Sequence, residues 1–251
     1  MWHRVTLRSA LRSDMTETPT HALVAATYNI HYSIGTDRRF APPRIADVIL
    51  SLNADVVALQ EVGWHYRGQA GIDQFELLGH LTGLQVHAGL TRNHPDAHFG
   101  NAILTGLPVR RTQTLDLSVP LHPPRCALIA ELGAAGGAFR VVNVHLGLNP
   151  WERRAQVKKL VGALDAAESL PTLLLGDFNE WRRTPTYLDP IGQRFPECSM
   201  PESFHARRPM FRYDRIYASP QFSLGHEQVI HAASARRASD HLPVVATVRR
   251  G

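Results

Sequence analysis

Polar residues follow the apolar segments of this 251-residue chain at positions where a sheet would end. The clearest case is the run from Leu173 to Leu175, which breaks at Gly176 and is followed by Asp177 and Asn179. In a strand, residues two positions apart point the same way, so a carboxylate and a carboxamide would converge on one small volume. Taken alone, the stretch is also explained by a strand that ends in an Asx turn.

Other predicted strands end in the same manner, and this favours a reactive site over a series of unrelated turns. The further positions are Asn29, Glu61, Asn101, His145, Asp214, Asp240 and His241. Brought together, these side chains would supply oxygen ligands for a hard cation, two imidazoles, and amide donors for a bound anion.

The elements that must position these residues are mostly short strands. We predict strands at 22–30, 56–60, 85–88, 101–105, 109–115, 125–131, 139–144, 173–175, 213–218, 221–231 and 242–249. We predict helices at 42–52, 73–81 and 151–167, the last with Ala155, Leu160, Val161 and Leu164 facing inward, and a long irregular connection over 180–212. Strands in both alternating and hairpin-like order predict a mixed sheet system covered by helices, and their number favours two sheets packed face to face.

Length and composition indicate a globular protein with an ample core. Hydrophobic residues make up 44% of the chain, and no apolar run approaches the ~18 residues of a membrane span. No linker interrupts the sequence, so we predict a disordered extension at 1–20 and a single domain over 21–251. The two cysteines, Cys126 in a strand and Cys198 in a loop, lack disulfide-framework or metal-site spacing and are predicted to be free thiols.

The net charge of +5 is concentrated near the end of the chain. Residues 1–181 contain 16 Lys/Arg and 16 Asp/Glu, whereas residues 182–251 contain 11 Arg and 6 acidic residues. A basic final third suits an anionic ligand, whether a phosphate ester, a nucleic acid or a lipid headgroup. A solvated arginine-rich surface explains the same count, since the chain has only two lysines.

Seven short motifs, in this order, resemble the endonuclease/exonuclease/phosphatase superfamily. They are TYNIH at 27–31, LQEV at 59–62, GNAIL at 100–104, NVHL at 143–146, GDFN at 176–179, YDRIY at 213–217 and SDHLP at 239–243. The resemblance implies a four-layer α/β sandwich, in which two mixed β-sheets pack face to face between helices. It also implies hydrolysis of a phosphoester with a divalent metal ion.

The resemblance implies a metal site for Mg²⁺ or Mn²⁺. Glu61 would ligate the ion directly, Asn29 would supply an amide oxygen, and Asp240 would bind directly or through water, because hard cations prefer oxygen ligands. The alternatives are an exposed strand-end acid for Glu61, a turn cap for Asn29, and a residue that holds His241 for Asp240.

The resemblance also implies a catalytic set. Asp214 would orient His241 and favour its charged form, while His241 removes a proton from the attacking water or polarises it. Asp177 and Asn179 would orient the water, and His145 would hydrogen-bond a non-bridging oxygen as charge develops. The alternatives are a surface capping role for His241 and an Asp–Arg pair of Asp214 with Arg215 or Arg212. Asn101 is either a structural amide or a contact to phosphate.

Two further groups of polar residues are set aside. His94 and His98 have helical spacing, but Pro95 between them excludes a helix and hence a metal pair. Residues 152–156, which include Glu152, Arg153 and Gln156, are interpreted as a solvated helix face rather than as a substrate contact.

The catalytic motifs do not identify the substrate, because surrounding loops decide it. Residues 100–109 and 29–37 look more like the sphingomyelinase-like and uncharacterised bacterial members than like the abasic-site endonucleases. The arginine pairs at 182–183, 207–208 and 236–237 would instead suit a polynucleotide backbone. We predict a phosphodiesterase, with a DNA or RNA nuclease, a phospholipid phosphodiesterase or phosphatase, and an inactive phosphate-binding adaptor as alternatives. We expect a monomer in the cytoplasm, with peripheral contact to a membrane left open.

Overall fold

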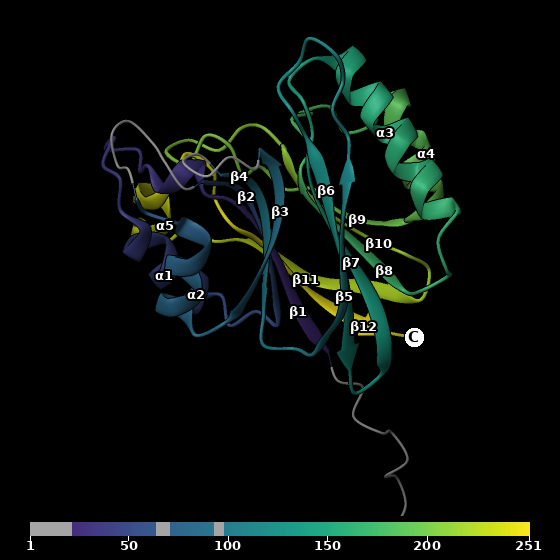
Figure 1. Cartoon of the computed structure of the whole chain (residues 1–251), viewed down its shortest axis with the longest axis horizontal. Helices are drawn as coiled ribbons and strands as arrows, with labels where there is room; N and C mark the ends of the chain where they lie inside the picture. The colour runs from purple at the N-terminus through teal and green to yellow at the C-terminus, as the bar shows by residue number, and fades with distance from the viewer. Residues whose placement is uncertain (1–21, 64–70, 93–97) are drawn as a thin grey trace, which may run out of the picture.

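Two β-sheets packed face to face between two layers of helices form the protein (Figure 1). The computed structural model describes residues 22–63, 71–92 and 98–251. The predicted four-layer α/β sandwich is confirmed. The expected extension at 1–20 and His94 lie outside the described residues, so both predictions about them stay predictions.

The first sheet has six strands in the order β11-β12-β1-β2-β4-β3. Its strands are β1 (Leu23–Asn29), β2 (Val56–Gly63), β3 (Gln85–Arg92), β4 (Phe99–Thr105), β11 (Phe222–Val229) and β12 (Val244–Arg250). Only β1 and β2 run parallel, and the other neighbouring pairs are antiparallel. Its outer face is covered by α1 (Pro42–Ser51), α2 (Gln74–Thr82) and α5 (Ala233–Ala238), and η1 (His31–Ser33) follows β1.

The second sheet also has six strands, in the order β5-β6-β7-β8-β10-β9. They are β5 (Val109–Asp116), β6 (Cys126–Ala134), β7 (Gly137–His145), β8 (Thr172–Asp177), β9 (Glu197–Ser199) and β10 (Asp214–Ala218). Here β7 and β8 are the parallel pair. The outer face packs against α3 (Pro150–Asp165) and α4 (Asp189–Arg194), and η2 (Thr186–Leu188) precedes α4.

The central strands are continuous apolar runs because both of their faces are buried. In β8, Leu173 and Leu175 point into the core between the sheets, whereas Leu174 points into the core under α3. Gly176 then adopts φ +147°, and a Cβ atom there would lie 1.9 Å from the Val144 carbonyl oxygen of the neighbouring strand. Glycine is therefore required at the position just before Asp177.

Buried amides connect the two sheets beneath the strand ends. Asn143 of β7 donates to the carbonyl oxygens of Leu59 and Ala102 in the other sheet, both at 2.8 Å, and accepts from Gln60 Nε2 at 2.8 Å. Asn101 of β4 donates to the carbonyl oxygen of Cys126 across the same gap at 3.1 Å. Of the two interpretations of Asn101, this contact supports the structural one.

The predicted connection over 180–212 was wrong in part, because it contains η2, α4 and β9. These elements are too short for a periodic signal, and they form where Tyr187, Ile191 and Phe195 pack beneath α3. Cys198 lies in β9 rather than in a loop, and both cysteines are free. The short helix α5 was also missed.

Helix α3 begins as predicted but packs differently. Asn149 caps it by accepting the Trp151 N–H at 2.9 Å, and Pro150 occupies the first turn. Leu160 and Leu164 are buried as expected, whereas Ala155 and Val161 are half-buried. The solvated face expected for 152–156 was wrong: Glu152, Arg153 and Gln156 are all buried.

No helix in the described ranges is both long and apolar enough to cross a membrane.

Candidate active site

Strand pairing brings the predicted site residues to one end of the two sheets. His145 at the end of β7 is the direct partner of Asp177 at the end of β8, and Asp177 is the direct partner of Asp214 at the start of β10. Directly paired residues project on the same face, so these three side chains form a row. In the other sheet, Asn29 ends β1 beside β2, which carries Glu61.

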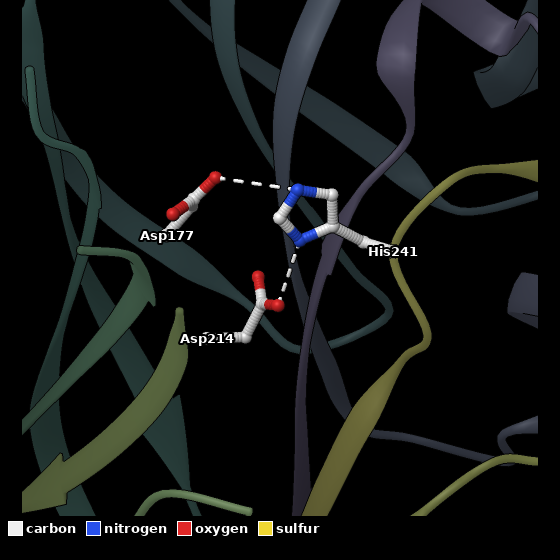
Figure 2. Close-up of side chains that lie close together, drawn as sticks. All are labelled: Asp177, Asp214 and His241. Carbon is white, nitrogen blue, oxygen red and sulfur yellow. Dashed lines mark hydrogen bonds and ion pairs between the residues drawn. The ribbon is translucent and has the colours of Figure 1, made fainter. Parts of the chain in front are cut away.

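His241 lies between two buried carboxylates (Figure 2). Its Nδ1 is 2.8 Å from Asp214 Oδ2, and its Nε2 is 3.7 Å from Asp177 Oδ2. Asp214 Oδ2 also accepts a hydrogen bond from Ser203 Oγ at 2.5 Å. Asp214 therefore pairs with His241 and Ser203, and not with Arg215 or Arg212, whose guanidinium groups bond to other residues.

The surroundings of His241 favour its charged form. Burial opposes the positive charge, but the Asp214 carboxylate, with Asp177 and Asp240, outweighs this effect and raises the pKa of His241 to about 10. The ring is consequently an imidazolium at neutral pH, held by Asp214 on one nitrogen and facing Asp177 with the other.

His145 shows the opposite behaviour although it is buried to the same extent. Burial, together with the charge of Arg125, lowers the pKa of His145 to about 3. Its Nε2 lies 3.7 Å from Asp177 Oδ2 and 4.0 Å from Glu61 Oε1. The site thus contains one neutral and one charged imidazole that share the Asp177 carboxylate.

Asn29 joins the two remaining carboxylates. Its Nδ2 donates to Glu61 Oε1 at 3.1 Å and to Asp177 Oδ2 at 3.0 Å, and its Oδ1 accepts the His31 backbone N–H at 3.0 Å. The amide oxygen that we expected as a metal ligand is therefore directed at the backbone. An amide oxygen could face a cation between Glu61 and Asp177 only if the Asn29 side chain turned over.

Glu61 occupies an irregular position in its strand. The predicted strand 56–60 continues to Gly63 across a change of register between Leu59 and Val62, and Glu61 has φ +58°. Bulges of this kind re-aim a side chain, and left-handed backbone in a residue other than glycine is often found at functional sites. Burial raises the pKa of the Glu61 carboxyl, an effect that the Asn29 hydrogen bond opposes, and 20% of the side chain is exposed.

Asp240 and Asn179 lie beside this group. Asp240 Oδ1 is 3.7 Å from His31 Nδ1 and 3.4 Å from Ser239 Oγ, and 24% of its side chain is exposed. Asn179 has φ +50°, donates its backbone N–H to Asp177 Oδ1 at 2.8 Å, and donates Nδ2 to the Leu146 carbonyl oxygen at 2.8 Å. Asn179 therefore connects the segment after β8 to the segment after β7.

The donor set fits a hard divalent cation at Glu61. Two carboxylates, those of Glu61 and Asp177, approach the same Asn29 amide group, and Glu61 keeps part of its surface open to solvent. Oxygen-rich, partly open sites of this type suit Mg²⁺ or Mn²⁺, which retain bound water. Asp177, Asp214 and His241 also lie close enough to share an ion, but His241 already pairs with both carboxylates there.

Arg153 was missed as a supporting residue. Its guanidinium donates to the Gly147 and Leu148 carbonyl oxygens at 3.1 and 2.6 Å and to Glu180 Oε2 at 3.2 Å. It thereby connects the loop after His145 with the loop after Asp177. The only sequence signal was a cluster of long polar residues at helical spacing at the start of α3.

Glu180 is fully buried and accepts hydrogen bonds from Arg153 and from two further residues. Its carboxylate accepts from Arg153, from Arg182 Nη2 at 2.8 Å and from Tyr187 OH at 2.5 Å. Burial opposes the negative charge, but the bonds from Arg182 and Tyr187 and the charge of Arg153 hold the pKa of Glu180 at about 2. The loop that carries Asp177 and Asn179 is thus anchored directly behind the site.

Comparison with known proteins agrees with this geometry. A family model for the Endonuclease/Exonuclease/phosphatase family matches residues 26–241. The uncharacterised protein YbhP of Escherichia coli (strain K12) is 29% identical over 253 residues, which cover 92% of this chain and 98% of YbhP.

Two solved structures share the fold of this chain. The endonuclease/exonuclease/phosphatase from Beutenbergia cavernae has a TM-score of 0.74 at 24% identity, over 92% of this chain and 72% of that chain. The mannosyl-6-phosphatase Bt3783 from Bacteroides thetaiotaomicron has a TM-score of 0.68 at 18% identity, over 90% of this chain and 99% of that chain. At these identities the likeness concerns the fold alone.

Proposed function

The chain belongs to the endonuclease/exonuclease/phosphatase family, and from that membership we propose that it is a hydrolase of phosphoric esters that uses a divalent cation. Within this class we propose a phosphodiesterase that works by attack of water. The observation that carries the proposal is the pair of buried imidazoles, His145 neutral and His241 charged, on either side of Asp177.

We assign the phosphoryl group to the space beside His145, Asn179 and His241. A neutral His145 donates one hydrogen bond to a non-bridging oxygen, and the His241 imidazolium offsets the negative charge that grows in the transition state. His241 and Asn179 are fixed before substrate arrives. Asp214 holds His241, and the Leu146 carbonyl oxygen holds Asn179. Little reorganisation is then needed during the reaction.

Asp177 orients the attacking water in this proposal. Its carboxylate is buried and held by Asn29 and by the Asn179 backbone, so it accepts from a water molecule in a fixed direction. The sequence left open whether His241 removes a proton from the water or polarises it. The raised pKa of His241 instead favours a charged ring, which donates to the phosphoryl group. The base role requires the neutral ring.

Glu61 would hold the cation, with Asn29 and Asp240 as the further predicted donors. The bound ion would polarise a phosphoryl oxygen and neutralise part of its charge. The proximity of Glu61 to His145 and Asp177 supports this assignment.

Hydrolysis of bis(p-nitrophenyl) phosphate and of p-nitrophenyl phosphate, with Mn²⁺ and with EDTA, tests the reaction class. We expect Mn²⁺-dependent release of nitrophenol with the diester preferred, and a loss of ~10²–10⁴ in turnover for His241→Ala. His80→Ala, which changes an exposed histidine on α2, is the matched control and should retain full activity. Turnover that EDTA leaves unchanged contradicts the proposal, and absence of turnover on every ester supports the adaptor alternative.

A parallel panel separates the substrate alternatives. Plasmid DNA, RNA, sphingomyelin, cardiolipin and inositol phosphates are incubated under one Mn²⁺ condition, with His241→Ala as the blank. Lipid turnover with untouched DNA and RNA removes the nuclease alternative, and nicking of plasmid DNA by wild type alone removes the phospholipid alternative.

A further inference from the structure

Large apolar side chains are exposed mainly at the end of the molecule that carries the site. Among the described residues, those at this end are Leu121, Leu148, Trp181, Met210 and Phe211 on loops and Trp151 in the first turn of α3. Leu50, in the last turn of α1, is the exception at the other end. Contiguous exposed apolar surface marks an interaction site in many soluble proteins.

Three of these residues lie on segments that Arg153 links, and we call them the tryptophan rim: Leu148, Trp151 and Trp181. Their exposed fractions are 74%, 79% and 57%. Arg153 links the three segments. Its guanidinium donates to the Leu148 carbonyl oxygen and to Glu180, which precedes Trp181 in sequence. Arg153 itself lies two residues after Trp151. Figure 1 shows α3, whose first turn contains Trp151, along the upper right side of the molecule.

The tryptophan rim borders the candidate active site. Asn179 donates to the carbonyl oxygen of Leu146, only two residues before Leu148, and Trp181 follows Asn179 by two residues. A surface that contacts the rim therefore lies next to the residues assigned to the phosphoryl group.

The exposed charged residues in the two segments that carry the tryptophan rim are of one sign. In the segments 146–160 and 178–188, the exposed charged residues are all cationic: Arg154, Lys158, Lys159, Arg182 and Arg183. The two carboxylates in these segments, Glu152 and Glu180, are buried, and Glu180 is paired with arginines. The exposed acid Asp189 follows directly after the second segment, so the cations outnumber the acids on this surface without excluding them.

A groove of about 450 Å³ lies along the flank of α3, and one of its lining residues, Arg154, has its guanidinium carbon 6.0 Å from the centre of the Trp151 ring. Its floor is apolar, with Val157, Val161, Tyr187 and Pro190, and Arg154 and Lys158 stand beside it. An apolar floor next to cations suits an amphiphile that has both an acyl chain and an anionic headgroup.

The composition distinguishes a lipid surface from a nucleic acid. Nucleic-acid bases stack on aromatic rings, and the aliphatic side chains of Leu148, Val157 and Val161 contribute nothing to such stacking. Tryptophan, leucine and cationic side chains together are typical of protein surfaces that insert into the boundary of a bilayer. We propose that the tryptophan rim docks this protein onto an anionic phospholipid surface, with the candidate active site facing the headgroups.

Docking requires no turnover, so it is tested separately from the proposed function. The full chain is sedimented with phosphatidylcholine vesicles that contain or lack phosphatidylglycerol. We expect binding to the anionic vesicles that weakens as NaCl is raised, because salt screens the attraction between the cations and the anionic surface. No binding of the wild type to phosphatidylglycerol vesicles overturns the proposal.

Matched variants locate the docking surface. Trp151→Ser combined with Trp181→Ser, and Arg154→Glu combined with Lys158→Glu, should each reduce vesicle binding about tenfold or more. The controls Leu50→Ser and Arg110→Glu with Arg111→Glu change exposed residues at the opposite end and should bind as wild type does. Circular dichroism confirms folding, and loss of vesicle binding in the controls as large as in the rim variants overturns the proposal.

A fluorescein-labelled single-stranded oligonucleotide tests the competing partner. Unchanged oligonucleotide binding in the rim variants, with reduced vesicle binding, supports the membrane surface. Reduced oligonucleotide binding with unchanged vesicle binding overturns it and assigns the rim to nucleic acid.

Discussion

At the residue scale, the site depends on two histidines whose protonation differs for physical reasons. Both are almost fully buried, and burial alone would keep both neutral. His241 has Asp214 at hydrogen-bond distance and two more carboxylates nearby, whereas His145 is influenced by Arg125 and has Asp177 and Glu61 only at 3.7 and 4.0 Å. Groups of one type driven to opposite charge states are a recurrent sign of divided roles in catalysis.

Replacing Asp214 by Asn tests the carboxylate partner of His241. The amide preserves shape but removes the charge that favours the imidazolium, so we expect kcat to fall ~10²–10³-fold with little change in KM. Asp189→Asn, an exposed residue of α4, is the control. Steady-state kinetics on the aryl diester measures kcat and KM of the two variants. A wild-type kcat in Asp214→Asn contradicts the role of Asp214 as the partner of His241.

Replacing Glu61 by Gln tests the cation site. Loss of the carboxylate should raise the Mn²⁺ concentration for half-maximal activity about tenfold or more, since the ion loses a charged ligand. Glu76→Gln, on the exposed face of α2, should not shift the Mn²⁺ titration. An unchanged titration in Glu61→Gln would show that the ion binds elsewhere.

At the scale of elements, α3 supports the site through its polar residues. Apolar periodicity predicted the helix, but it could not predict that Arg153 and Glu152 face inward. Their burial depends on partners that are distant in sequence, above all Glu180 and the carbonyl oxygens of the 147–148 loop. Similarly, β2 was expected to stop at Gln60, and only cross-strand pairing reveals the irregular turn that places Glu61.

The Glu180 anchor predicts an acid-dependent loss of stability. Because the folded state lowers the pKa of Glu180 from 4.5 to about 2, its contribution is complete above pH 4.5 and is lost as the pH falls toward 2. We expect Glu180→Gln to reduce the free energy of unfolding by about 2–4 kcal/mol at pH 7, with a smaller difference at acid pH. Urea unfolding of wild type and Glu180→Gln at several pH values measures this difference in unfolding free energy.

The exposed Glu168→Gln serves as the control for Glu180→Gln, because it changes the same side chain on the surface after α3. Its unfolding free energy should follow that of wild type at every pH. A constant difference between Glu180→Gln and wild type from pH 7 to acid pH would contradict the role of the Glu180 charge.

At the scale of the whole molecule, the sequence predicted the architecture and the identity of the convergent residues. Strands such as 173–175 are buried on both faces, and their apolar runs are evident without coordinates. The orientation of the Asn29 amide was not predictable, because it follows from a backbone turn at His31 and from two carboxylates on other strands. The fold of 180–212 was not predictable either, since it depends on packing under α3.

The amide bridge between the sheets should contribute strongly to global stability. Asn143→Ala leaves the Leu59 and Ala102 carbonyl oxygens and Gln60 without their buried partner, which should cost about 3 kcal/mol of unfolding free energy. Gln113→Ala, on the exposed edge strand β5, should change stability by less than about 0.5 kcal/mol. Urea denaturation compares the two, and equal effects would contradict a special role for Asn143.

The pairing of β1 with β12 has a consequence for biosynthesis. Residue 241 is translated 212 residues after residue 29. A nascent or prematurely terminated polypeptide that stops before 239 would lack both the strand that completes the first sheet and the imidazolium beside Asp177. The proposed hydrolysis would therefore reach its full rate only after the residues beyond 239 have been translated and β12 has paired with β1.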